Sequence, residues 1–197
     1  SLADPSNPPF EIIVVDNGGN ESIVTELHRR SLLLIQPPVN VLPSEARNIG
    51  VHFARASTVV FVDDGATVAP GYLASIPAAF EAFEIVALRG KVLPQTDHEH
   101  NGRVRHYNLG DVPITADINT EGNAAIRVAV WKQVGGQDPL LFGGEGVEFS
   151  FRVTARFGPS SILYWPSAVI YHDYADEDAK LDRKNDRHRS ARTYLEW

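Results

Sequence analysis

The sequence predicts an α/β fold: an open, mainly parallel sheet flanked by helices, in a single domain. Short apolar, β-branched runs alternate with segments whose apolar residues recur at helical spacing. The runs are apolar throughout rather than alternating with polar residues, which is typical of parallel strands covered on both faces. Several runs end in Asp, Asn or Gly. Because ligands of open α/β sheets bind outside the carboxyl ends of the strands, the residues after the strands are the first candidates for a site.

The first half of the chain reads as successive β-α-β units. Apolar runs closed by turn or polar residues predict strands at 11–16, 32–35, 58–62 and 85–88. Helical spacing predicts helices at 22–30, 43–56 and 70–83. Pro43 and Pro70 stand near helix starts, where proline is tolerated, and Pro77 predicts a kink in the third helix.

The second half begins with a polar segment at 95–110 that we interpret as a long surface loop. It contains His98, His100 and His106, which lack the helical i, i+4 placement of a metal pair, so we interpret them as solvated residues. Further strands are expected at 123–127, 162–165 and 168–171, and helices at 128–134 and 147–157. Residues 176–197 carry mixed charge at helical intervals and predict an exposed helix.

The composition fits one globular domain and excludes several classes of function. The chain has 197 residues, of which 43% are hydrophobic and 22% charged, enough to build a core without disulfides. A net charge of -7 argues against nucleic acid as a partner, and the absence of cysteine excludes thiol nucleophiles and Cys-ligated metals. No apolar run approaches the ~20 residues of a membrane span. Because the chain starts at Ser1 and contains no Met, we expect it to be an internal segment of a longer protein.

Acidic residues follow two of the predicted strands. Asp16 ends the first strand, and Asp63 and Asp64 follow the third. Adjacent carboxylates at a strand end can hold a hard divalent cation, with substrate phosphates and water completing its shell. Asp-Asp-Gly is also a common turn sequence, since Asp bonds to its own backbone and Gly permits positive φ. The pair alone leaves both interpretations open.

A set of short segments resembles, in order, the family 2 glycosyltransferases. They are residues 11–19, 44–50, 59–64, 70–73, 122–123, 134–139 and 142–152. Their order across residues 8–172, and their positions at strand ends and helix starts, make the set specific although each segment is weak alone. The resemblance implies a Rossmann-like nucleotide-diphospho-sugar transferase domain that catalyses inverting transfer of a sugar to an acceptor hydroxyl.

The same resemblance implies partners, a cofactor and a division of the chain. The partners are a nucleotide-diphosphate sugar and a carbohydrate or lipid-linked acceptor, in glycan, glycolipid or polysaccharide synthesis, and the cofactor is Mg or Mn. Residues 1–94 correspond to the nucleotide-sugar-binding half, 95–172 to the acceptor and catalytic half, and 173–197 to a charged C-terminal helix. We expect a cytoplasmic domain, with any contact to the inner face of a membrane made through regions outside this chain.

On the donor side, the resemblance assigns these residues to the nucleotide sugar: Asp16, Asn17, Arg47, Asn48, Asp63 and Asp64. The first pair corresponds to contact with the base, the second pair lies beside the nucleotide, and the third pair begins the DxD motif. A leaving nucleoside diphosphate accumulates negative charge, which a cation held by carboxylates or a basic side chain can neutralise.

On the acceptor side, Glu145 matches the first acid of the Glu-Asp pair around the catalytic base. Inversion needs one carboxylate near the acceptor hydroxyl, to take its proton during attack on the anomeric carbon. The resemblance places Gly122, Asn123 and Gly144 near the acceptor. His172 resembles a histidine that reaches the metal or diphosphate in some members, so we expect it to share a metal site with Asp64.

Three departures from the family pattern keep a second hypothesis open. Gly65 stands where the last Asp of DxD is expected, and Gly146 where the Asp of the Glu-Asp pair is expected. The family's first strand would precede Ser1, so one place in the sheet should be unfilled. A catalytically silent domain that binds a sugar or a partner is therefore the alternative to an enzyme. A nucleotidyltransferase is a weaker alternative, since no Gly-rich phosphate loop with a basic residue is found.

Each candidate also has a purely structural interpretation. Arg47 could be a solvated helical charge, Glu145 could cap the helix that follows it, and His172 could be a structural residue at a strand end. Glu148 is better explained by pairing with Arg152 one helical turn later.

Overall fold

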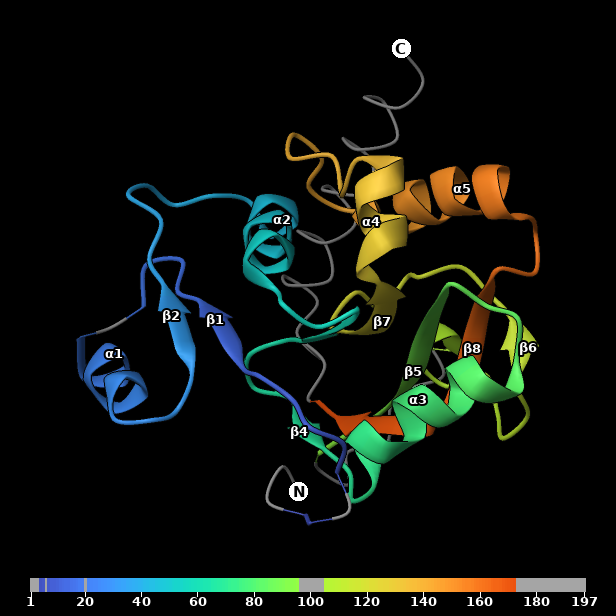
Figure 1. Ribbon diagram of the computed structural model, residues 1–197, viewed down its shortest axis with the longest axis horizontal. Coiled ribbons are helices and arrows are strands. Elements are labelled where there is room, and N and C mark those ends of the chain that lie inside the picture. The colour runs from blue at the N-terminus through green and yellow to red at the C-terminus, as the bar shows by residue number, and fades with distance from the viewer. Residues whose placement is uncertain (1–3, 6, 20, 96–104, 173–197) are drawn as a thin grey trace.

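The computed structural model describes residues 4–5, 7–19, 21–95 and 105–172 (Figure 1). Helices and strands alternate along the first part of the chain, as predicted. The elements are β1 (Ile13–Val15), α1 (Glu21–His28), β2 (Leu33–Ile35), α2 (Pro43–Phe53), β3 (Thr58–Val62), β4 (Thr67–Val68), α3 (Tyr72–Ala82) and β5 (Ala87–Leu93).

The second part of the chain adds two helices and two longer strands. Its elements are the 3-10 turn η1 (Arg105–Tyr107), β6 (Ile114–Thr115), β7 (Asn123–Arg127), α4 (Val128–Val134), α5 (Glu145–Phe157) and β8 (Ile162–Tyr171). The short strands β4 and β6 were not predicted. The expected C-terminal helix, together with His98 and His100, lies outside the described residues.

The strands form a main sheet and a separate pair. The main sheet has the order β3-β7-β5-β8-β4, with β6 on β8, while β1 and β2 pair in parallel with each other. β5 and β8 are parallel, and β7 is antiparallel to both of its neighbours, β3 and β5. β3, β5 and β8 therefore run in one direction. The open α/β sheet is confirmed, and the antiparallel insertion of β7 between β3 and β5 is the feature that the apolar pattern did not reveal.

Helices cover both faces of the main sheet (Figure 1). On the α3 face, Tyr72, Ile76 and Ala79 pack against Leu88 of β5 and Leu163 of β8. On the other face, α4 and α5 enclose a second cluster with the strands. Its central members are Ala87, Ala124, Ile126, Trp131, Phe149, Val153 and Ile162. Neighbouring residues such as Ala87 and Leu88 belong to opposite clusters, because successive side chains of a strand point to opposite faces.

β8 is one strand where two were predicted. Its pairing with β5 jumps from Gly90–Trp165 to Lys91–Val169, so a bulge accommodates the segment that contains Pro166. A Cβ on Gly90 would lie 2.1 Å from the carbonyl oxygen of Ala168, so only glycine fits opposite the bulge.

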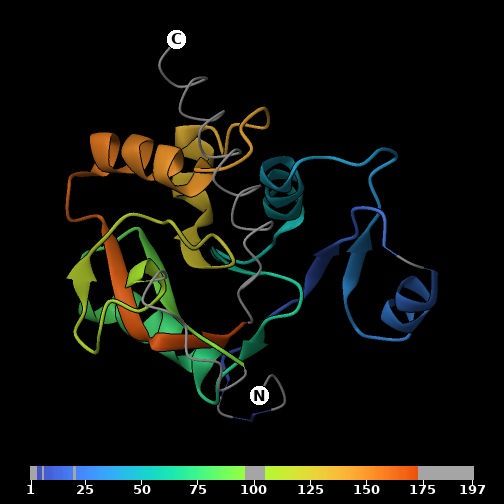
Figure 2. The same ribbon diagram turned by 180° about the vertical axis from the view of Figure 1, so that it is seen from behind.

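The pair β1–β2 and helix α1 stand to one side of the main sheet, and α2 lies between this pair and α4 (Figures 1 and 2). In the described part of the chain, no strand pairing joins β1 or β2 to β3. That one place in the sheet is unfilled stays a prediction. No helix among the described residues is long and apolar enough to cross a membrane.

Candidate functional site

The site begins where the end of β3 meets the start of β7. The antiparallel register pairs Val62 with Asn123, and the next residue, Asp63, donates its backbone N–H to the carbonyl of Gly122 at 3.3 Å. A Cβ on Gly122 would lie 2.1 Å from the carboxylate of Asp63. Gly122 therefore allows an acidic side chain to lie directly on the backbone of the neighbouring strand.

Helix α2 adds a positive charge to this point. A guanidinium nitrogen of Arg47 lies 3.5 Å from Oδ1 of Asp63, and the other lies 3.5 Å from the side-chain oxygen of Gln137. The Arg47 side chain is 16% exposed and that of Asp63 is 50% exposed, so the pair opens to solvent on the aspartate side. The structure thus brings together two of the residues that the sequence assigned to the nucleotide sugar.

Asn48, the neighbour of Arg47, fastens the loop after α4. Its amide oxygen accepts the backbone N–H of Gln137 at 3.0 Å, and its amide nitrogen donates to the carbonyl of Gln137 at 2.9 Å. These bonds hold Gln137 against α2, where it contacts Arg47. The amide nitrogen of Asn48 also donates to Glu45 of the same helix at 3.2 Å, so Asn48 bonds both to the loop and to α2.

Glu145 is the first residue of α5 and is 7% exposed. Its Oε2 accepts the backbone N–H of Gly143 at 2.8 Å, within a turn where Gly143 and Gly144 both have positive φ. The carboxylate thus bonds to the loop before the helix, whereas the sequence-based alternative was a cap on the helix itself. The helix begins two residues before the predicted Val147.

Glu121 is a site residue that the sequence analysis missed. Its Oε1 accepts the backbone N–H of Gly146, in the first turn of α5, at 2.6 Å. Burial is the main cause that raises the pKa of Glu121, and the neighbouring charge of Glu145 raises it further; the positive charge of Arg47 opposes both. The sequence did carry a signal for Glu121. An acid that directly precedes a strand lies beside the end of β3 if that strand is antiparallel to β3, as β7 is.

Asp16 and Asn17 organise the loops after β1. Asp16 accepts the N–H of Gly19 at 2.6 Å and the side-chain amide of Gln36 at 3.0 Å. Asn17 exchanges two hydrogen bonds with the backbone of Val41, the segment that leads into α2. Both side chains therefore shape the loop ahead of the helix that carries Arg47.

Asp64 lies exposed after Asp63, in a turn where Gly65 has a φ of 78°. The side-chain nitrogen of Gln95 donates to the carbonyl of Gly65 at 2.8 Å and to that of Tyr171 at 3.1 Å. One amide thus joins the residue after Asp64 to the residue before His172. The described residues contain no group of three or more His, Asp or Glu side chains placed to hold a metal ion.

Asn123 is 1% exposed and belongs to the interior of the sheet. It donates to the carbonyls of Lys91 and Ala168 at 2.9 and 3.0 Å, and accepts the hydroxyl of Tyr72 at 2.8 Å. Burial raises the pKa of this tyrosine, which therefore stays protonated and able to donate. Asn123 holds the bulge of β8 in place, and its side chain does not reach the surface.

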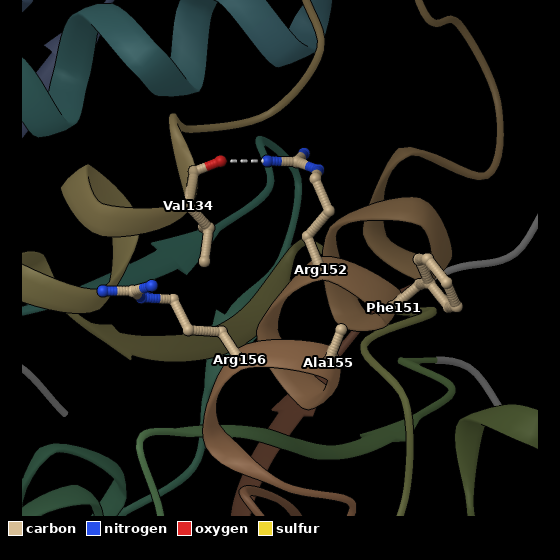
Figure 3. Close-up of a pocket in the computed structure, with 5 residues that line it drawn as sticks. All are labelled: Val134, Phe151, Arg152, Ala155 and Arg156. Atoms are coloured by element: carbon tan, nitrogen blue, oxygen red, sulfur yellow. Dashed lines mark hydrogen bonds between the residues drawn. The ribbon is translucent and has the colours of Figure 1, made fainter.

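Two further expectations concern the periphery of the site. The predicted pair of Glu148 with Arg152 is confirmed, with nitrogen–oxygen distances of 2.5 and 2.6 Å. Arg152 and Arg156 also line an open hollow on α5 beside Val134, shown in Figure 3. Arg152 bonds to Glu148 and to two backbone carbonyls, and Arg156 bonds to Gln133. The hollow is therefore lined by arginines that already have partners, whereas the site described above is lined by carboxylates.

The ring of His106 packs on the ring of Tyr107, with the two ring centroids 4.1 Å apart.

Comparison with solved structures finds the same fold in other proteins. The crystal structure of GalNAc-T7 with UDP, GalNAc and Mn2+ has a TM-score of 0.64 at 17% identity, over 83% of this chain and 38% of that one. S. aureus TarS 1-349 in complex with UDP-GlcNAc has a TM-score of 0.60 at 18% identity, over 86% and 51%. A mycobacterial protein has a TM-score of 0.67 at 15% identity, over 94% and 63%. The chain thus spans roughly a third to two thirds of the length of these proteins.

Comparison with curated proteins gives no match. Comparison with protein families gives one that covers most of the chain: the profile of glycosyl transferase family 2 matches residues 1–134. This range contains β3, the start of β7, and four of the side chains described above: Arg47, Asp63, Asp64 and Glu121. Together with the fold, this match shows that the chain belongs to glycosyl transferase family 2.

Proposed function

We propose that this protein transfers a sugar from a nucleotide-diphosphate donor to an acceptor hydroxyl, with inversion at the anomeric carbon. The observation that supports this most is the convergence of Arg47, Asp63, Glu121 and Glu145 where β3, β7, α2 and α5 meet. Arg47 lies next to one acid, and two further acids lie nearby. Such a set can stabilise the leaving diphosphate and also accept the proton of the attacking hydroxyl. The positive side faces a leaving diphosphate, and the acidic side faces an attacking hydroxyl.

The donor is proposed to be a uridine-diphosphate sugar. Two of the similar structures contain UDP or UDP-GlcNAc, and both share the fold. Arg47 would offer its guanidinium to the diphosphate in place of part of its contact with Asp63, which is long at 3.5 Å. Asp16, Asn17 and Asn48 would support the donor through the loops that they hold, and Asp63 and Asp64 through the strand end.

Asp64 and His172 are proposed to hold a divalent ion, Mg or Mn, together with the diphosphate. Magnesium sites commonly use one or two protein carboxylates and complete their shell with water and substrate phosphates, so the small protein donor set is compatible with this role. The shared contact of Gln95 with Gly65 and Tyr171 supports their proximity. Such an ion would neutralise charge on the leaving diphosphate. The protein's own residues supply the remaining steps.

Glu145 is proposed to take the proton of the acceptor. In an inverting transfer the acceptor oxygen attacks the anomeric carbon from the side opposite the diphosphate, so the base must lie across the sugar from the diphosphate site. The acceptor, carbohydrate or lipid-linked, is proposed to bind beside the glycine turn before Glu145, near Gly144 and the strand start at Gly122. Proton removal by such a base contributes typically 10²–10⁴-fold to the rate.

The alternative function is a silent binding domain. Gly65 stands where the last Asp of the DxD motif is expected. No described side chain lies within 4 Å of the position that its Cβ would take, so no other acid fills the place of that Asp. A domain without transfer activity would bind nucleotide sugars and leave them intact. The two functions are distinguished by measuring both nucleotide binding and sugar turnover: a transferase shows both, and a silent domain shows binding alone.

The test uses the full-length protein and a panel of nucleoside diphosphates and their sugars, titrated by calorimetry with Mn present or removed by a chelator. We expect a nucleoside diphosphate to bind and its sugar to be transferred or slowly hydrolysed. In Glu145→Gln, turnover should fall by roughly 10²–10⁴-fold with nucleotide affinity unchanged. The matched control is Glu84→Gln, an exposed acid after α3, which should keep full turnover. Binding without any turnover in the wild type would establish the silent domain instead.

A further inference from the structure

The start of α5 is built around a side chain from another element. Gly146 lies in the first turn of this helix, and a Cβ built there would lie 2.4 Å from Oε1 of Glu121 and 2.8 Å from its carboxyl carbon. The carboxylate of Glu121 thus occupies the space into which a side chain at position 146 would project. Glycine at position 146 and glutamate at position 121 form one arrangement, because any larger residue at 146 would displace the acid.

Both acids at this point are fastened in the same way. Glu121 gives one oxygen to the N–H of Gly146 at 2.6 Å, and Glu145 gives one oxygen to the N–H of Gly143 at 2.8 Å. The carboxylate of Glu121 also accepts a hydrogen bond from its own backbone N–H. In the described part of the chain, neither acid has an oxygen among the fully buried unpaired atoms. These backbone hydrogen bonds fix the orientation of both carboxylates.

The electrostatic surroundings make these acids a coupled pair. The charge of Glu145 raises the pKa of Glu121, which means that the two carboxylates lie close enough to repel each other. The positive charge of Arg47, from α2, lowers the pKa of Glu121, and the first turn of α5 adds the partial positive charge of a helix N-terminus. The repulsion from Glu145 favours the protonated form of Glu121, so Glu121 holds an accepted proton more readily than an isolated carboxylate would.

We propose that Glu121 is a second catalytic carboxylate of this site, which accepts the proton of the acceptor hydroxyl jointly with Glu145. This inference rests on the sugar transfer proposed above. It also supplies a carboxylate in the space next to residue 146, where the chain itself carries only glycine.

The step balances as follows. The acceptor O–H bond breaks and its proton passes to a carboxylate oxygen of the pair, while the acceptor oxygen forms a bond to the anomeric carbon. The bond from that carbon to the diphosphate oxygen breaks, and its electron pair leaves with the nucleoside diphosphate. The proton on the pair then passes to water, which restores both carboxylates for the next turnover.

A raised pKa suits this task. A base works best when its pKa lies near the working pH, and both burial and the charge of Glu145 move Glu121 in that direction. The competing role for Glu121 is a structural one: its carboxylate caps α5, whose own N-cap residue, Gly144, has no side chain to do so. The experiment must therefore separate proton transfer from support of the helix.

The experiment compares wild type, Glu121→Gln, Glu145→Gln, the double variant and the control Glu84→Gln in the full-length protein. Glutamine keeps the acceptor oxygen for Gly146, so the cap is retained while the base is lost. We expect kcat of Glu121→Gln to fall by roughly 10²–10⁴-fold, with UDP affinity within about twofold of wild type and Tm unchanged or raised. The double variant should be little worse than the poorer single variant, because the pair acts as a unit.

Two further measurements distinguish the base from the cap. Formate should restore part of the turnover of Glu121→Ala, because a small carboxylate can enter the vacated space, whereas formamide, which can accept the N–H of Gly146 but cannot take the proton, should not. The acidic limb of the pH profile should move to lower pH in Glu145→Gln, where the repulsion on Glu121 is gone; this holds even if Glu121 variants do not fold. Full turnover in Glu121→Gln, or no formate response with an unmoved acidic limb, overturns the proposal while leaving sugar transfer standing. A wild type that binds nucleotide and never turns over defeats the transfer itself.

Discussion

Replacing Gly146 by alanine tests whether Glu121 really occupies the space beside this residue. At an unhindered helical position, glycine to alanine stabilises a protein by up to about 1 kcal/mol, because alanine has the higher helix propensity. At position 146 the added Cβ would lie 2.2 Å from the carbonyl oxygen of Ile118 and 2.4 Å from Oε1 of Glu121. The first contact is with backbone and cannot be relieved by a side-chain rotation. We therefore predict the opposite sign from the usual one.

The magnitude follows from these contacts. Overpacking costs typically about 1–3 kcal/mol, and displacing Glu121 from Gly146 removes a hydrogen bond to a charged group, worth about 1.5–3 kcal/mol. Against the helix-propensity gain, we expect a net loss of about 2–4 kcal/mol in the free energy of unfolding, or about 5–15 °C in Tm for a chain of this size. The assay is guanidinium unfolding of wild type and Gly146→Ala, each also in a Glu121→Ala background. There the loss should shrink but persist, because Ile118 remains. A neutral or stabilising Gly146→Ala would refute the packing described at the start of α5.

Three other predictions concern the interior of the sheet, the donor site and the pH dependence of stability. Asn123→Ala should lower the free energy of unfolding by about 3 kcal/mol, since it leaves the hydroxyl of Tyr72 and two backbone carbonyls without their partner in the interior. Tyr72→Phe removes only one of these hydrogen bonds and should lower it by about 1–2 kcal/mol. Equal effects of the two substitutions in urea unfolding would contradict this. Arg47→Ala should weaken UDP binding by roughly 10–100-fold in calorimetry, and unchanged affinity would remove Arg47 from the donor site. Because the pKa of Glu121 is raised in the folded state, there is a pH window, between the ordinary carboxyl pKa and this raised pKa, in which the native protein holds a proton that the unfolded chain has lost. This group's contribution to stability should therefore fall as pH rises from the usual carboxyl range through the raised pKa, and Glu121→Gln should abolish that fall in unfolding measured against pH.

The elements of the fold followed closely from local patterns. β3, β7 and α4 have the predicted bounds, because an apolar β-branched run and a run with helical spacing are each signalled by the residues that form them. Strand direction is different, since it depends on the whole chain path. β7 is buried on both faces, and the sequence of such a strand does not distinguish a parallel from an antiparallel direction.

The missed direction of β7 explains the missed site residue. If β7 were parallel, Glu121 at its start would lie at the edge away from Asp63; since it is antiparallel, Glu121 and Gly122 meet the end of β3. Asn123 shows the reverse case. It stood in a segment that resembles the family, yet its amide is used entirely inside the sheet, and a motif alone could not distinguish a buried amide from one that faces a ligand.

Inverting transfer is tested most directly by following the anomeric configuration of the transferred sugar. The full-length protein is incubated with the nucleotide sugar that calorimetry identifies and with saccharide or lipid-linked acceptors, and the anomeric proton of the product is recorded by NMR before it equilibrates. We predict a product of configuration opposite to the donor, formed at a rate that falls by roughly 10²–10⁴-fold when either Glu121 or Glu145 is replaced by glutamine. A product that keeps the donor's configuration, or a sugar that stays on its nucleotide with every acceptor while the nucleotide binds, would contradict the proposed reaction.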